Sequence, residues 1–194
     1  MAQQETRTAL LRAGIELMRI RGYNHTGIKE ILDQVGVPKG SFYHFFDSKE
    51  AFGREALNYY VDQFEAFMGH FFTDQSVRPL QRIRNFFEAS RQRLESEECR
   101  GGCIVGNFAQ ELADQDEAFR LSLARIMDAW EARFTTCLEE AQQDGDIGAN
   151  MDAGELAQFI FDSWEGAILR TKTTKDLTPV DSFINVIFNT VLKT

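Results

Sequence analysis

Hydrophobic side chains recur every three to four residues along most of the 194-residue chain, which is the period of an α-helix. Only three prolines occur, at positions 38, 79 and 179, so long stretches carry no helix-breaking residue. The pattern predicts an all-α protein of about nine helices. We expect a short third helix opened by Pro38, a ninth helix from Thr178 with core residues up to Leu192, and the others at residues 5–21, 27–34, 48–72, 79–97, 104–112, 116–144 and 152–173.

Capping and terminating residues mark the ends of these segments. Helices should stop at Gly22, Gly36 and Gly145, because glycine readily adopts the left-handed conformation that closes a helix. They should start at polar caps or at prolines. These predicted starts are Thr26, Pro38, Ser48, Pro79, either Asp114 or Asp116, Asp152 with Glu155, and Thr178 with Pro179.

The second and third helices, joined by a tight turn at Gly36, follow the helix-turn-helix pattern. In that arrangement the third helix lies in the major groove of DNA with its first residues toward the base edges. Phe42 and Phe46 are four residues apart and should face the core of a three-helix domain. The outer surface is then left to polar side chains, namely Lys39, Ser41, Tyr43 and His44.

Side-chain chemistry assigns roles within this surface. Lys39 can donate to guanine acceptors, Ser41 can bond either kind of base edge, and Gly40 lets the backbone approach DNA. Tyr43 and His44 suit phosphate contacts, and Lys49 at the start of the fourth helix forms a phosphate clamp with the helix dipole. Any one of these residues alone would be an ordinary solvated side chain. The predicted DNA-binding set is Thr26, Lys39, Gly40, Ser41, Tyr43, His44 and Lys49.

Charge is distributed unevenly along the chain. Residues 1–50 hold seven Lys and Arg against six Asp and Glu, a net charge of +1. Residues 51–194 have a net charge of −10, so the whole chain has −9. The asymmetry allows a local contact with phosphate while the acidic part stays off nucleic acid. It also argues against an architectural, nonspecific DNA-binding protein.

The cysteines suggest chemistry in the second part of the chain. Cys103 follows Gly101 and Gly102 at the start of the sixth helix, where the helix dipole lowers a thiol pKa, and Lys172 could approach it. A small buried residue in a pocket wall explains Cys103 equally well. Cys99 is a weaker candidate for a resolving thiol, since Cys-x₃-Cys without a nearby His makes a poor zinc site. Cys137 should be core.

Aromatic residues are abundant, with seventeen Phe and two Trp. They would suit an apolar effector cavity between helices, and we place Phe108, Trp130 and Trp164 there. Ordinary hydrophobic core explains each of them as well.

Residues 5–60 resemble the DNA-binding domain of TetR-type repressors. The segment from Val37 to Phe52 carries the resemblance, with Gly-Ser-Phe-Tyr-His-Phe-Phe followed by Ser-Lys-Glu-Ala-Phe, although Phe45 stands where many members have His. The resemblance implies an all-α homodimer on a palindromic DNA operator, with a DNA-binding domain at 1–50 and an effector and dimerisation domain at 51–194. It also implies a dimer seam formed by the eighth and ninth helices.

Gly101-Gly102-Cys103, together with the run from Trp164 to Lys172, resembles the N-ethylmaleimide-responsive branch of that family. In that branch a cysteine at this place senses electrophiles or oxidants. The resemblance implies that an electrophilic or small apolar effector releases the protein from DNA. The alternatives are a purely non-covalent hydrophobic ligand, with Cys103 structural, or activation in place of repression.

An enzyme is the competing class of function. The three His residues show no metal-binding spacing, and no P-loop, nucleophile elbow or dinucleotide fingerprint is present. We therefore expect no catalysis, no cofactor and no metal site. Neither a signal peptide nor an apolar run long enough to span a membrane is visible, and three cysteines form no disulfide framework, so we expect a cytoplasmic protein.

Overall fold

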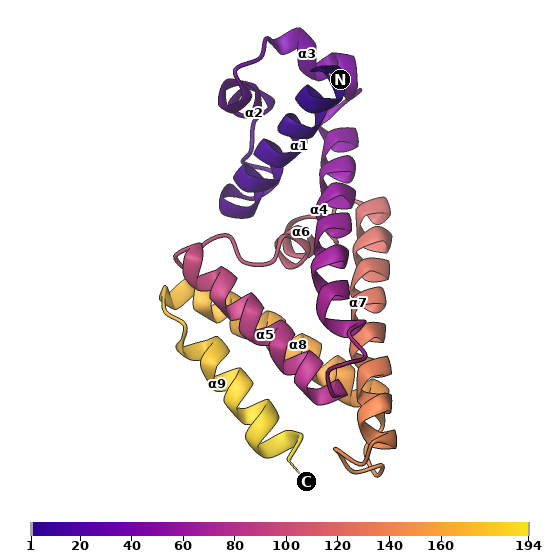
Figure 1. The fold of residues 1–194 in the computed structure, drawn as a ribbon. Helices are drawn as coiled ribbons and strands as arrows, with labels where there is room; N and C mark the ends of the chain where they lie inside the picture. Colours follow the sequence, from indigo (N-terminus) through magenta and orange to yellow (C-terminus); the bar gives the residue numbers. More distant parts are fainter. Residues whose placement is uncertain (1, 194) are drawn as a thin grey trace. The chain divides into compact units, whose positions relative to one another are not determined.

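The computed structural model describes residues 2–193, which form nine α-helices and a closing π-helical turn, with no β-strand in that range (Figure 1). The all-α prediction is therefore confirmed. In chain order the elements are α1 (Ala2–Arg21), α2 (Ile28–Val35), α3 (Lys39–Phe45), α4 (Lys49–Phe72), α5 (Pro79–Ser96), α6 (Ile104–Leu112), α7 (Glu117–Gln143), α8 (Ala153–Thr174), α9 (Thr178–Val186) and the π-turn η1 (Ile187–Val191).

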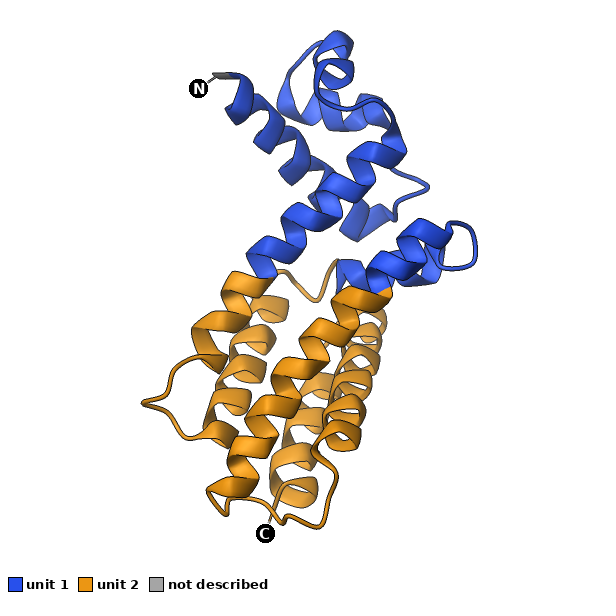
Figure 2. Ribbon diagram, turned by 90° about the vertical axis from the view of Figure 1, so that its right-hand side faces the viewer, with its two compact units in different colours: residues 1–64, 103–123 blue, residues 65–102, 124–194 orange. Residues whose placement is uncertain are grey.

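The helices group into two compact units, coloured separately in Figure 2. Unit 1 comprises residues 1–64 and 103–123, and unit 2 comprises residues 65–102 and 124–194. The boundaries between these units fall inside α4 and inside α7. The functional division into domains at 1–50 and 51–194 stays a prediction. Unit 1 contains α6 as well as the helix-turn-helix.

Three phenylalanine rings form the centre of the helix-turn-helix in unit 1. Phe42 lies 5.3 Å from Phe46 and 5.2 Å from Phe52, measured between ring centres, and all three are almost completely buried. A Cβ atom at Gly14 would lie 2.3 Å from the Phe52 ring, so glycine allows α1 to approach that ring. The predicted inward direction of Phe42 and Phe46 is confirmed.

Unit 2 is built around a second aromatic cluster. The Phe87 ring on α5 stacks on Phe134 of α7 at 5.5 Å and contacts Trp164 of α8 at 4.8 Å. Phe183 of α9 completes the group, 5.0 Å from Phe87. Such tilted and stacked aromatic pairs add stabilisation beyond the area that they bury.

The predicted helix ends are mostly confirmed. Gly22, Gly36 and Gly145 have φ of +87°, +75° and +74°, the left-handed conformation expected of them. The Ser48 hydroxyl accepts the Ala51 N–H at 3.0 Å, and Asp116, not Asp114, accepts the Phe119 N–H at 3.0 Å. Asp152 accepts the N–H of Glu155 at 2.9 Å.

Several boundaries differ from the predictions. Gly27, not Thr26, is the residue before α2, and Pro38 stands before the first residue of α3 instead of occupying it. The first helix begins at Ala2 rather than at residue 5. The ninth helix widens into the π-turn after Val186, because its backbone bonds shift register there.

Candidate DNA-binding and effector sites

The third helix presents a polar face whose inner side is anchored. Phe42 is fully buried, while Lys39 and His44 are exposed and Tyr43 keeps 51% of its surface. The Ser41 N–H donates to the carbonyl of Pro38 at 2.9 Å, which closes the first turn. The structure therefore brings the predicted contact residues of α3 to one accessible surface.

Gly40 has no packing role within the described residues. A Cβ atom built there would meet nothing within 4 Å, and its φ is not in the left-handed region. Neither the space around it nor the backbone requires glycine at this position. The close approach of DNA to Gly40 stays a prediction.

Lys49 is engaged within the protein. Its Nζ donates to the Asn24 carbonyl at 3.2 Å and lies 4.7 Å from the centre of the Tyr23 ring. Burial lowers the pKa of Lys49, and the nearby Glu111 carboxylate opposes that shift. The phosphate clamp predicted for Lys49 stays a prediction, and a structural role now stands beside it.

Thr26 is wholly buried, so we no longer propose it as a DNA contact. Its hydroxyl donates to the Gly22 carbonyl at 2.7 Å, which closes the turn between α1 and α2. The residue was expected to cap α2, but the Glu30 carboxylate accepts the Gly27 N–H there instead, at 3.2 Å.

Sequence reasoning missed a residue that holds the same turn. The Glu111 carboxylate on α6 accepts the backbone N–H groups of Tyr23 and Asn24, each at 3.0 Å. Because Glu111 lies 87 to 88 residues from the turn along the chain, the sequence does not indicate this contact. The available signal was a lone acidic residue in a helix that is otherwise apolar or uncharged.

Cys103 stands directly before α6, as predicted, and is half-buried. Gly101 and Gly102 before it have φ of +75° and +69°. A Cβ atom at Gly102 would lie 3.4 Å from Cδ of Lys172, so the Lys172 stem passes close to the backbone one residue before the thiol. This proximity within unit 2 supports the expected approach of a lysine to that part of the chain.

The other two cysteines are buried. The Cys99 backbone is left-handed, with φ of +55°, and its carbonyl accepts from Lys175 Nζ at 3.2 Å. The Cys137 thiol donates to the Pro79 carbonyl at 3.1 Å, and burial raises its pKa to about 12. Cys137 is therefore a core residue, as predicted.

The three aromatic effector candidates all lie in core. Phe108 is fully buried in unit 1, 5.6 Å from Tyr23 and 6.1 Å from Phe119. Trp130 and Trp164 are buried in unit 2, where their rings contact Phe161 and Phe87. Elsewhere in unit 2, the Thr171 hydroxyl of α8 is buried without a hydrogen-bond partner among the described residues.

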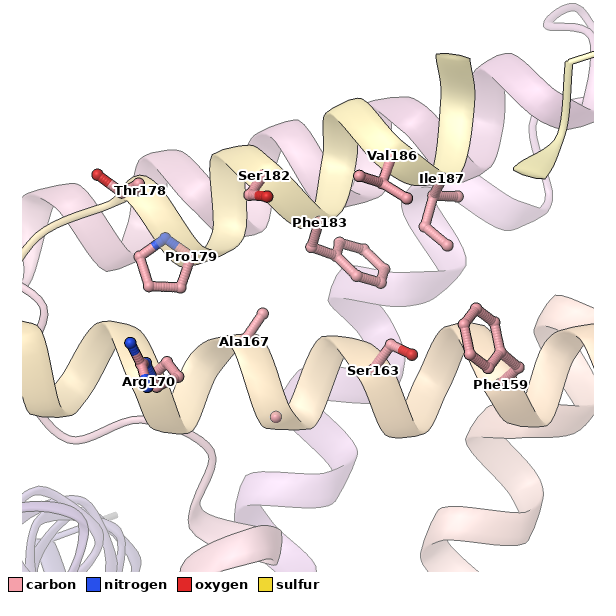
Figure 3. Close-up of a pocket in the computed structure, with 11 residues that line it drawn as sticks. Phe159, Ser163, Ala167, Arg170, Thr178, Pro179, Ser182, Phe183, Val186 and Ile187 are labelled. Carbon is pink, nitrogen blue, oxygen red and sulfur yellow. The ribbon is translucent and has the colours of Figure 1, made fainter. Parts of the chain in front are cut away.

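A groove of about 490 Å³ runs between α8 and α9 on unit 2 (Figure 3). Phe183 points from α9 toward α8, and Phe159 and Val186 keep 54% and 45% of their surface exposed. Phe159 and Val186 therefore give the groove exposed apolar surface, and Leu169 of α8 is exposed outside the groove lining.

Two family models match this chain. Residues 10–56 match bacterial regulatory proteins of the tetR family, and residues 79–187 match the tetracyclin repressor-like C-terminal domain. The chain belongs to the TetR family. It is thus a helix-turn-helix transcriptional regulator, like the relatives that it resembles.

Relatives within the TetR family align over nearly the whole chain. The HTH-type transcriptional repressor DhaR of Mycobacterium sp. (strain GP1) is 35% identical over 99% of this chain and 95% of its own. The crystal structure of regulatory protein TetR from Rhodobacter sphaeroides has a TM-score of 0.90 at 36% identity, covering 94% of this chain and 96% of that one.

The reduced form of NemR from Escherichia coli has a TM-score of 0.85 at 25% identity, covering 95% of this chain and 97% of its own. The match confirms the resemblance to the NemR branch of the TetR family. Across residues 2–193, no helix is both long and apolar enough to cross a membrane.

Proposed function

We propose that this TetR-family protein is a transcriptional repressor that binds a palindromic DNA operator as a homodimer and leaves it when an effector binds. The accessible polar face of α3 supports this proposal most directly, because the buried Phe42 on the opposite face anchors the helix. Lys39, Gly40 and Ser41 would read base edges, and Tyr43 and His44 would hold phosphates. A regulator that binds chromosomal DNA works in the cytoplasm.

The groove between α8 and α9 is the proposed dimer surface. A second copy of the chain related by a two-fold axis would place the same apolar helices against each other, giving a four-helix seam. Exposed Phe159, Leu169 and Val186 supply the apolar area that such a seam buries. Two copies of α3 would then meet two half-sites of a palindrome.

The effector is proposed to be electrophilic or small and apolar, with Cys103 as the sensing thiol. Cys103 is only half-buried, stands at a helix start, and follows two left-handed glycines beside the Lys172 stem. Addition to the thiolate would favour a state with low DNA affinity, and so shift the population off the operator. Cys99, four residues before Cys103 in the chain, stays the weaker candidate for a resolving thiol, whereas Trp130, Trp164 and Phe108 serve as core.

The test is selection of genomic DNA fragments by the purified protein, with and without N-ethylmaleimide, repeated for Cys103→Ser. We expect one palindromic sequence to be enriched. Maleimide should abolish this enrichment for the protein that contains Cys103, but not for the Cys103→Ser variant. Retention of random fragments without any enriched sequence would contradict a specific repressor.

The second candidate is a regulator whose hydrophobic ligand binds non-covalently, with Cys103 structural. The buried, unpartnered Thr171 hydroxyl favours it, because a ligand with a polar group could satisfy that oxygen. Release of Cys103→Ser from the operator by maleimide, as readily as the unmodified protein, would support this second candidate.

A further inference from the structure

The turn between α1 and α2 is held by a carboxylate from α6. Glu111 accepts the N–H of Tyr23 through Oε1 and the N–H of Asn24 through Oε2, each at 3.0 Å. Gly22 makes room for it, since a Cβ atom there would lie 2.3 Å from the same Oε1. Two adjacent peptide N–H groups thus share one charged acceptor, a strong form of hydrogen bond.

A cation on α4 holds the other side of the turn. Lys49 Nζ donates to the Asn24 carbonyl at 3.2 Å and lies over the Tyr23 ring. The N–H groups of residues 23 and 24 therefore face an anion, while the carbonyl of residue 24 faces a cation. Both charged side chains belong to unit 1.

A second residue of α6 reaches α1 itself. The Asn107 side chain, one helical turn before Glu111, donates to the Arg19 carbonyl at 3.1 Å. Arg19 lies in the last turn of α1, where carbonyl groups lack partners within the helix. α6 thus supplies an acceptor for the turn and a donor for the helix before it.

The turn determines where α2 begins. The Thr26 hydroxyl bonds back to the Gly22 carbonyl, and α2 starts two residues later and packs against α3. A shift of residues 22–24 would therefore move the start of α2 and, with it, the base-facing residues of α3.

We propose that Glu111 is a positioning residue for DNA recognition, fixing the α1–α2 turn together with Lys49 so that α3 is presented in one orientation. This inference rests on the proposed function, because DNA binding is the activity that the turn would support. A glutamate on α6 would then take part in DNA binding without touching DNA.

The test compares Glu111→Gln with Asp114→Asn, which removes the same charge from an exposed carboxylate that has no hydrogen bond or ion pair among the described residues. Hydrogen exchange of the Tyr23 and Asn24 amides is followed by NMR. Binding is measured to the duplex that the unmodified protein selects from genomic fragments. Glutamine keeps the length of the side chain, but its single carbonyl oxygen can accept from only one of the two N–H groups, and neither N–H keeps a charged acceptor.

For Glu111→Gln we expect both amides to exchange about tenfold faster and the Kd for the duplex to rise about tenfold, with the helix content unchanged. Asp114→Asn should leave both quantities as they are. Faster exchange with unchanged duplex binding would overturn the positioning role, and so would equal weakening by Asp114→Asn. Unchanged exchange would show that Glu111 does not hold the turn.

Failure of the proposed function gives a different result. In that case the unmodified protein itself would retain no genomic duplex, which would remove the repressor role and the role of Glu111 in DNA binding together. Equal, tight duplex binding by unmodified protein and Glu111→Gln would instead overturn only the inference about Glu111.

Discussion

Neighbouring residues of α3 have two different roles, since one packs into the core and those beside it face solvent. Phe42 faces inward onto Phe46 and Phe52, and the adjacent Ser41 and Tyr43 are left toward solvent. Because the anchor is aromatic and fully buried, the polar residues on either side are held on a rigid base. That rigidity suits recognition, since contacts with base edges require fixed donors.

Lys39 is the residue on which to test base reading. Lys39→Ala should raise the Kd for the selected duplex about tenfold, because one charged donor to a base or phosphate is lost. Loss of selectivity at one base pair would indicate a base contact, and uniform weakening with a smaller salt slope would indicate a phosphate contact.

Lys193→Ala, which removes an exposed lysine near the end of unit 2, is the matched control for Lys39→Ala. Its duplex binding should equal that of the unmodified protein. Equal binding by Lys39→Ala as well would remove Lys39 from the proposed recognition surface.

Cys137 should be inert where Cys103 reacts. Its thiol pKa of about 12 lies above the ordinary value of 9.0 because the side chain is buried, so roughly one molecule in ten thousand carries the thiolate at pH 8. Maleimide at that pH should label Cys103 first, as read by peptide mass spectrometry. Labelling of Cys137 ahead of Cys103 in folded protein would contradict the placement of both thiols.

The same shift has a consequence for stability. A thiol that stays protonated when folded stabilises the native state below pH 9, and this contribution is lost as pH rises from about 9 to about 12, because the unfolded chain ionises first. Cys137→Ala should weaken that alkaline dependence of the free energy of unfolding.

At the scale of elements, α6 connects the candidate sensor Cys103 with the α1–α2 turn. Cys103 precedes its first residue and Glu111 lies near its end, about 12 Å further along the helix axis. Ile104, Phe108 and Leu112 are buried along one face, so the helix should respond to a displaced end as one body. A short, well-packed helix of this kind can carry a displacement to its far end.

We therefore expect N-ethylmaleimide on Cys103 to speed hydrogen exchange at the Tyr23 and Asn24 amides several-fold. The adduct would displace the start of α6 and loosen the hold of Glu111 on the turn. Residue-resolved NMR exchange of labelled and unlabelled protein measures this, with Cys103→Ser as the control. Unchanged exchange at both amides in the labelled protein would rule out α6 as the connection.

Local signals in the sequence were enough to place most elements. Ser48, Asp152 and Gly36 each act on neighbours within a few residues, so their caps and turns were predictable. Thr26 was predicted to cap α2, but its hydroxyl donates instead to the Gly22 carbonyl, four residues earlier in the turn. Glu111 was missed because its partners lie 88 and 87 residues away along the chain.

At the scale of the whole molecule, dimerisation decides whether two copies of α3 can share one operator. Phe159→Glu would place an unpaired carboxylate in the α8–α9 groove. Burying that charge costs about 3 kcal/mol, which corresponds to about a hundredfold weaker dimer. Sedimentation equilibrium should detect the resulting monomer, and duplex binding should fall with it.

Leu121→Glu is the control for Phe159→Glu, because Leu121 is a large apolar side chain with 41% of its surface exposed outside the groove. It should leave the dimer intact. If both variants stayed dimeric, the seam would have to be sought on another face.

The division of the chain into units could not be read from the sequence. The motif from Val37 to Phe52 identified the DNA-binding end, but nothing local indicates that residues 103–123 belong to the same compact unit. That membership depends on contacts between α6 and α1, such as the Asn107 bond to Arg19, which form only when the chain is folded.

Because unit 1 is made from two separate stretches of chain, we expect that residues 1–64 alone would not transfer its DNA preference to another protein. A chimera that took residues 1–64 from one TetR-family protein and the rest from another would pair a foreign turn with the native Glu111 and Asn107. Transplanting residues 103–123 along with them would keep the turn and its holder from the same parent. Diversification of such regulators by recombination at a single crossover should therefore be disfavoured, and changes in α6 should accompany changes in the α1–α2 turn.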